Sequence, residues 1–202
     1  MFYVDKRAWL KRRRQALQKL ARDLAKGRVD EGLIPLLEAI NSHKCFYTLS
    51  SCYGRVLLLE IEKIGIKTAG EFYRSWHWPV TLNEIIEAAR DYRGDKSLWL
   101  MVQSTILHVS TYNLDLAIRF RNLALNAGYK YSKILSISRR GIVIEVLGTE
   151  RLDIPIKIKG EWIVNLDNLK IVEDYIKQMF FRIEKRKNRF IELLKKEKFK
   201  NF

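Results

Sequence analysis

The feature that most constrains the fold of this chain is an uninterrupted amphipathic stretch near its C-terminal end. From Asn168 onward no proline or glycine occurs. Apolar residues recur there at intervals of three, four or seven positions, which is the spacing of one helix face. They are Leu169, Val172, Ile176, Met179, Ile183, Phe190 and Leu194. The pattern predicts one long helix over residues 168–199.

A second amphipathic stretch lies near the N-terminal end. Leu10, Leu17, Leu20 and Leu24 form a narrow apolar stripe over residues 6–26, and Gly27 follows as a stop signal. A shorter helix is expected to run from Asp30, a candidate N-cap, to about Asn41.

Between these helical ends, residues 45–165 are rich in β-branched and aromatic residues, which favours strands. A capping box of Thr81 and Glu84 predicts a helix over 82–93, and Asn113 and Gly128 bound a helix over 114–126. The strands are expected at 45–50, 55–63, 70–77, 97–109, 131–138, 141–147, 154–158 and 161–164. Residues 51–54 are interpreted as the turn of a hairpin, and so are residues 139–141.

This order of elements predicts an α+β fold with a mixed sheet of six to eight strands flanked by helices. No G-x-G-x-x-G motif follows a strand, so a Rossmann nucleotide-binding fold is not expected. No linker rich in glycine, serine or proline divides the chain. We therefore expect one domain over 1–202, with basic helical ends 6–26 and 168–199 packed around a β-rich body 45–165.

The positive charge is concentrated at the two ends. The chain has 38 Lys and Arg against 23 Asp and Glu, a net charge of +15. Residues 1–28 hold 10 basic and 2 acidic residues, and residues 182–200 hold 9 and 3, so the middle is nearly neutral. Two basic ends around a neutral body indicate a polyanionic partner such as a nucleic acid. The alternative is that both ends are merely solvated helix faces.

Other classes of protein are disfavoured. No run of about 18 apolar residues suggests a membrane span, and the basic first 28 residues do not resemble a secretory signal. Cys45 and Cys52 are the only cysteines, which argues against a disulfide scaffold and is typical of a cytoplasmic protein. With His43, their spacing matches no structural zinc pattern, so we expect no metal.

The segment from Thr48 to Arg55 is the richest in chemistry. It places three aliphatic hydroxyls, a thiol, a glycine and a guanidinium within eight residues. Gly54 permits positive φ or close backbone approach, and Arg55 can bind a carboxylate or phosphate through two parallel hydrogen bonds. The alternative is an ordinary turn that ends in a surface arginine.

Two histidines are candidates for proton transfer, because imidazole titrates near neutral pH. His77 lies between Trp76 and Trp78 at an expected strand end, where the indoles offer a stacking surface for a base. His108 lies among apolar residues on another strand. The alternatives are core tryptophans and a core histidine with satisfied hydrogen bonds.

Together these segments resemble the wybutosine-synthesizing family that carries out the late tRNA methylation of its pathway. The resemblance covers roughly residues 3–195. Its most specific part is Ser50-Ser51-Cys52-x-Gly54-Arg55, and Tyr53 stands where the family usually has a small residue. The other matching segments are Trp76 to Pro79, the strand with His108 and Val109, Ala127 to Ser132, and Leu152 to Ile156.

The resemblance implies an S-adenosylmethionine-dependent methyltransferase with a non-Rossmann fold. Its target would be the N-4 nitrogen of the tricyclic guanosine derivative next to the anticodon of tRNA(Phe). Alternatives are a non-catalytic tRNA- or RNA-binding module and an RNA nuclease.

On this hypothesis, Ser50, Ser51, Cys52 and Gly54 contact the methyl donor, and Arg55 holds its carboxylate or a tRNA phosphate. His77 is the first candidate for the proton acceptor and His108 the second. Trp76 or Trp78 stacks on the extruded base. The residues expected to grip RNA phosphates are Arg12, Arg13, Arg14, Lys185, Arg186, Lys187 and Arg189.

Overall fold

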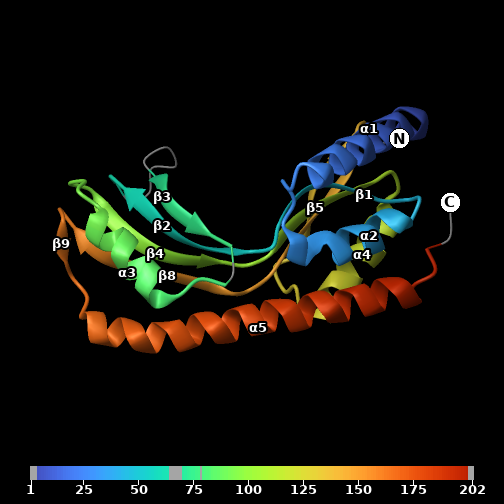
Figure 1. Cartoon of the computed structure of the whole chain (residues 1–202). Helices are drawn as coiled ribbons and strands as arrows, with labels where there is room; N and C mark the ends of the chain where they lie inside the picture. The colour runs from blue at the N-terminus through green and yellow to red at the C-terminus, as the bar shows by residue number, and fades with distance from the viewer. Residues whose placement is uncertain (1–3, 64–69, 78, 200–202) are drawn as a thin grey trace. The chain divides into compact units, whose positions relative to one another are not determined.

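The computed structural model describes residues 4–63, 70–77 and 79–199. Helices separate groups of two to four consecutive strands along the chain (Figure 1). In order they are α1 (Lys6–Ala25), the 3-10 helix η1 (Glu31–Leu33), α2 (Ile34–Ser42), β1 (Tyr47–Cys52), β2 (Arg55–Ile61), β3 (Gly70–Trp76), α3 (Leu82–Asp91), β4 (Ser97–Gln103), β5 (Ile106–Thr111), α4 (Leu114–Ala127), β6 (Lys133–Ser138), β7 (Gly141–Leu147), β8 (Arg151–Ile158), β9 (Glu161–Trp162) and α5 (Leu166–Lys196). Within the described ranges, no helix is both long enough and apolar enough to cross a bilayer.

The chain forms two compact units, each assembled from segments that are separate in sequence. Unit 1 contains the described parts of Met1–Tyr53, Thr105–Thr149 and Ile183–Phe202, and unit 2 contains those of Gly54–Ser104 and Glu150–Arg182. Each unit is built on one antiparallel sheet. The strand order is β1-β5-β7-β6 in unit 1 and β3-β2-β4-β8-β9 in unit 2.

The α+β class expected from the sequence is confirmed, but the strands form two antiparallel sheets instead of one mixed sheet. The hairpin expected at residues 51–54 is wrong, because β1 pairs with β5 whereas β2 pairs with β3 and β4. The strand expected over 97–109 is divided at Ser104 and Thr105 into β4 and β5, one in each sheet. Whether the two units unfold together as the single domain expected stays a prediction.

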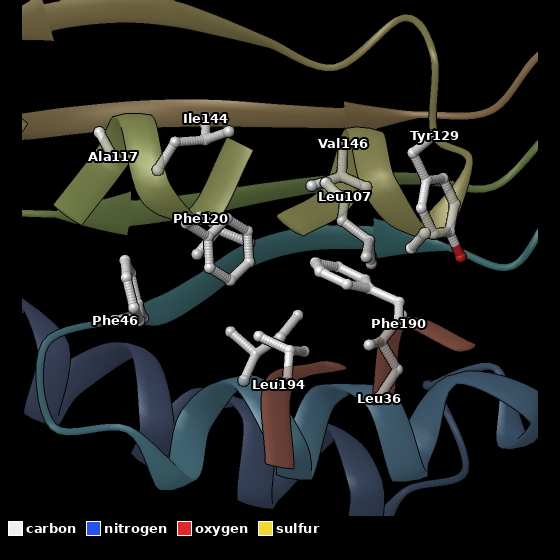
Figure 2. Packing of buried hydrophobic residues seen from close by; sticks show 14 of the residues in the cluster. Leu36, Phe46, Leu107, Ala117, Phe120, Tyr129, Ile144, Val146, Phe190 and Leu194 are labelled. Atoms are coloured by element: carbon white, nitrogen blue, oxygen red, sulfur yellow. The ribbon is translucent and has the colours of Figure 1, made fainter. Parts of the chain in front are cut away.

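One face of the unit 1 sheet is buried beneath helices. Leu107 on β5 and Ile144 and Val146 on β7 point into a cluster that also contains Phe120 of α4 and Phe190 of α5 (Figure 2). Because strand side chains alternate between faces, the residues between these positions point to the opposite face. The core therefore decides which side of the sheet is available for chemistry.

Helix caps fix the helices of unit 1 where the sequence predicts them. The Asn113 side chain accepts a hydrogen bond from the Leu116 backbone N–H, and Gly128 ends α4 in the left-handed conformation at φ 109°.

On α1, the Trp9 ring is fully buried and its Nε1 donates to Ser110 Oγ at 3.0 Å. This hydrogen bond attaches α1 to the sheet on the side of Ser110.

In unit 2, the expected capping box is confirmed. Thr81 and Glu84 cap α3 reciprocally, and the helix buries Leu82, Ile85 and Ala89. Lys157 is buried and donates to the carbonyl oxygens of Ala89 and Tyr92 at the other end of α3, at 3.1 and 3.3 Å. A lysine at this position satisfies carbonyl groups that the end of the helix leaves unpaired.

Candidate active site

Four polar side chains form a continuous row across the sheet of unit 1. Ser50 Oγ lies 2.9 Å from His108 Nδ1, and His108 Nε2 lies 3.2 Å from Glu145 Oε2. Lys133 Nζ lies 3.0 Å from the other oxygen of Glu145. The strand register explains the row, because Ser50 pairs with His108, His108 with Glu145, and Lys133 with Glu145.

The row lies on the sheet face opposite the apolar core. His108 alternates with Leu107 and Val109, which are fully buried in that core. The side chains of His108 and Glu145 retain 24% and 12% of their exposed area, so both are shielded but reachable from solvent. His108 is therefore not a core histidine, which was the alternative that the sequence left open.

The row also fixes the hydrogen-bonding roles of the imidazole. A carboxylate can only accept hydrogen bonds, so His108 Nε2 carries the proton that Glu145 accepts. In the neutral ring, Nδ1 is then the basic atom, and it faces the Ser50 hydroxyl. This arrangement can take up a proton at Nδ1 and balance the resulting charge with Glu145.

A cavity of about 380 Å³ opens beside the same serine. Residues from α1, from the loop before η1 and from β1 line it: Ala16, Lys19, Leu20, Asp23, Arg28, Val29, Asp30, Thr48, Leu49, Ser50 and Ser51. Its volume falls within the range of small-molecule sites. The structure thus brings Ser50 and Ser51 of the sequence motif together with His108 at the edge of a cavity.

The charged side chains of the cavity are of both signs. Lys19 Nζ donates to Asp23 Oδ2 at 2.5 Å, and this hydrogen bond lowers the pKa of the Asp23 carboxyl. Arg28 and Asp30 add a further charge of each sign. A ligand that carries both an ammonium and a carboxylate would find a counter-charge for each group.

Asp30 also holds the motif in place. Its Oδ2 accepts a hydrogen bond from the Tyr53 backbone N–H at 2.7 Å, and Thr105 Oγ1 donates to the Tyr53 carbonyl at 2.7 Å. Gly54 follows at φ 114°, the positive φ that the sequence allows there. The backbone after Ser51 and Cys52 is therefore fixed by side chains from two other segments.

Tyr53 is not among the residues that line the cavity. Its hydroxyl donates to Glu184 Oε2 on α5, and Lys187 Nζ binds the same carboxylate at 2.7 Å. Burial, followed by the bond to Glu184, raises the pKa of Tyr53. Burial opposes ionisation of Glu184, but the bonds from Lys187 and Tyr53 outweigh it and lower the pKa of that carboxyl.

The remaining motif residues belong to unit 2. Arg55 lies on β2 with its guanidinium 5.7 Å from the centre of the Phe72 ring. Trp76 is half-buried at the end of β3, and His77 is exposed directly after it. Trp78 lies outside the described residues. The roles expected for these side chains stay predictions.

The basic residues expected to grip RNA divide into exposed and internal side chains. Arg14, Lys185 and Arg189 are exposed. Arg13 is tied to α2 and to the segment after it, because its guanidinium donates to the carbonyl oxygens of Phe46 and Asn41 at 2.9 and 2.8 Å. Burial lowers the pKa of this guanidinium. Arg12 is half-buried.

On α5, Arg186 and Lys187 are buried. The guanidinium of Arg186 lies 5.4 Å from the centre of the Tyr129 ring, and Lys187 binds Glu184. We therefore do not include these two residues in the proposed RNA surface.

Sequence reasoning did not identify Glu145, Lys19, Asp23 or Arg28 as site residues, and it treated Asp30 only as a helix cap. Glu145 had a usable signal, since it is the one charged residue in the apolar strand 141–147. Lys19 and Asp23 of α1 and Arg28 of the loop after it had no such signal, because a charged helix face is normally solvated.

Residues 11–196 match the family model described as Methyltransferase TYW3. A similar protein from Pyrococcus horikoshii bears the name tRNA(Phe) 7-((3-amino-3-carboxypropyl)-4-demethylwyosine(37)-N(4))-methyltransferase 1. It is 41% identical over 162 residues, which are 80% of this chain and 82% of that protein. A relative with the same name, without the final number, from Methanocaldococcus jannaschii is 33% identical over 83% of this chain and 86% of its own. The solved structure of the PH1069 protein from Pyrococcus horikoshii superposes with a TM-score of 0.85 at 35% identity, covering 91% of this chain and 94% of that one.

Proposed function

Because the chain belongs to the Methyltransferase TYW3 family, we propose that it methylates the N-4 nitrogen of the tricyclic wyosine-type guanosine derivative in tRNA(Phe). The methyl donor is S-adenosylmethionine, and the reaction takes place in the cytoplasm. The observation that carries this proposal is the cavity lined by Ser50 and Ser51, beside the hydrogen-bonded pair of Ser50 and His108. The names of the relatives supply the nucleoside and the tRNA.

The chemistry of the cavity suits the proposed donor. S-adenosylmethionine supplies an electrophilic methyl group on a sulfonium, and its amino-acid end carries an ammonium and a carboxylate. Lys19 and Arg28 provide positive charge for a carboxylate, and Asp23 and Asp30 provide negative charge for an ammonium or acceptors for hydroxyls. Ser51 offers a further hydroxyl. Cys52 and Gly54, the other expected donor contacts, are not among the described residues that line this cavity, and the Cys52 side chain is buried.

The proton acceptor in this proposal is His108, ahead of His77. The ring nitrogen of the substrate loses a proton as it gains the methyl group, so a base near the donor cavity assists the reaction. Nδ1 of His108 faces the Ser50 hydroxyl, which lines that cavity, and Glu145 holds Nε2. The proton passes through the Ser50 hydroxyl to Nδ1, and Glu145 stabilises the imidazolium that forms.

The residues of unit 2 keep the substrate-binding roles expected from the sequence. Arg55 binds a carboxylate or phosphate, and Trp76 or Trp78 stacks on the extruded base. The exposed basic side chains Arg14, Lys185 and Arg189 bind the phosphates of the anticodon stem.

The proposed function is tested by methyl transfer in vitro. The protein is incubated with S-adenosylmethionine tritiated in its methyl group and with tRNA from cells blocked before this step. We expect label in the tricyclic nucleoside after digestion, and no label with tRNA that lacks the tricyclic base. Binding of tRNA without label would favour the non-catalytic module, and shortened tRNA would favour a nuclease.

A further inference from the structure

A second cavity lies at the other end of α1. It measures about 280 Å³, and Asp5, Ala8, Arg12, Arg139 and Arg140 line it. Arg139 and Arg140 form the turn between β6 and β7, and both are exposed. Three arginines from two separate parts of the chain therefore line one hollow together with a single acidic residue, Asp5.

Hydrogen bonds to the backbone hold this turn against α1. The Asp5 backbone N–H donates to the Arg139 carbonyl at 3.3 Å, and Arg12 Nη2 donates to the Arg140 carbonyl at 2.9 Å. The Arg139 and Arg140 guanidinium groups are not used in these bonds. In the described part of the chain, neither group forms an ion pair or hydrogen bond.

The other groups at the cavity also leave positive charge unbalanced. Asp5 Oδ1 accepts the Ala8 backbone N–H at 3.0 Å, so this carboxylate serves as the N-cap of α1. Arg12 Nε is buried and has no hydrogen-bond partner among the described residues. The Arg12 guanidinium also forms no ion pair with a described residue, so its positive charge is available to an anion in the hollow.

This cavity and the proposed donor cavity follow one face of α1. Asp5, Ala8 and Arg12 line the first, and Ala16, Lys19 and Asp23 line the second. Their spacing of three and four residues places all six on the same side of the helix. Arg12 and Lys19 are seven residues apart, about 10 Å along the axis. That length is about three nucleotides at roughly 3.4 Å per nucleotide in a stacked strand.

We propose that the cavity of Arg12, Arg139 and Arg140 binds backbone phosphates of the substrate RNA about three nucleotides from the nucleotide that is methylated. The inference rests on the proposed function, because that function places the reacting base beside the donor cavity. Arginine suits this role, since its planar guanidinium binds two phosphate oxygens at once. The turn thus anchors the strand while α1 directs it toward Ser50.

The test compares two double variants that lose the same charge. Arg139→Ala with Arg140→Ala removes the two guanidinium groups and keeps their backbone hydrogen bonds. The control is Arg90→Ala with Arg93→Ala in unit 2. Arg90 lies in the last turn of α3 and Arg93 follows that helix, and both side chains are exposed. Binding of the precursor tRNA is measured over a series of salt concentrations, and methylation by the wild-type protein is measured alongside.

We expect the turn variant to bind tRNA roughly 10- to 30-fold more weakly at 0.15 M salt. The slope of log K against log salt should flatten by about 0.7–0.9 for each phosphate that the variant no longer binds. The control should change affinity less than threefold. An unchanged slope in the turn variant, or an equal loss of affinity in the control, would overturn the phosphate site. A wild-type protein that binds tRNA but does not methylate it would instead overturn the proposed function.

Discussion

Replacing His108 by alanine is expected to lower the turnover number for tRNA methylation by about 10²- to 10⁴-fold, the usual contribution of a general base. The affinity for S-adenosylmethionine should change by only a few-fold, because His108 does not line the donor cavity. The fold should survive, since Glu145 keeps its ion pair with Lys133 at 3.0 Å when the imidazole is removed. Single-turnover methylation and calorimetry with the donor measure the two effects separately.

Two further variants sharpen this prediction. Glu145→Gln should reduce turnover less than His108→Ala. The amide oxygen can still accept a hydrogen bond from the His108 Nε2–H, but a neutral amide stabilises an imidazolium less than a carboxylate does. His77→Ala should retain most of the turnover number, since His77 is not among the described residues that line the donor cavity or form the row of Ser50, His108 and Glu145. Wild-type turnover in His108→Ala would exclude His108 as the proton acceptor. A large loss confined to His77→Ala would assign that role to His77.

Replacing Phe190 by alanine is expected to lower the free energy of unfolding of unit 1 by about 3–5 kcal/mol. Phe190 is fully buried, and its ring centre lies 5.5 Å from that of Phe120 and 5.6 Å from that of Tyr129. Truncation leaves a cavity that this packed cluster cannot fill (Figure 2). Urea unfolding followed by fluorescence and circular dichroism measures the decrease in stability.

The control is Phe181→Ala on the same helix, in the part of α5 that belongs to unit 2, where the side chain is 71% exposed. It should change the free energy of unfolding by less than about 0.5 kcal/mol. Equal effects of the two substitutions would mean that the last turns of α5 do not belong to the core. The expected difference also means that the basic C-terminal end is not a detachable RNA-binding arm, because Phe190 and Leu194 hold it in unit 1.

The helices could be predicted from the sequence because their signals are local. Asn113 and Gly128 bound α4 within the chain itself, and Thr81 with Glu84 fixes the start of α3. Strand pairing is not local, and this is where prediction failed. Nothing in the residues at 51–54 or at Ser104 and Thr105 indicates that the chain passes from one sheet to the other, because alternation continues on both sides.

The candidate site could be predicted only in part, because its geometry also depends on strand pairing. Ser50 and Ser51 were identified from the density of functional groups around them, but their proximity to His108 depends on the register of β1 with β5. That register places residues 58 positions apart within hydrogen-bonding distance. The cavity walls on α1 required the tertiary structure, since Ala16, Lys19 and Asp23 look like an ordinary helix surface in the sequence.

The central claim is that the cavity between α1 and β1 binds the methyl donor, and calorimetry of S-adenosylmethionine binding to two variants of α1 tests it most directly. Ala16 lines this cavity, whereas Ala21 on the same helix lines a different hollow. Ala16→Phe should fill the donor cavity and abolish binding of the donor. Ala21→Phe makes the same change in composition and should leave the dissociation constant within about twofold of that of the wild type. Unchanged binding in folded Ala16→Phe would contradict the account.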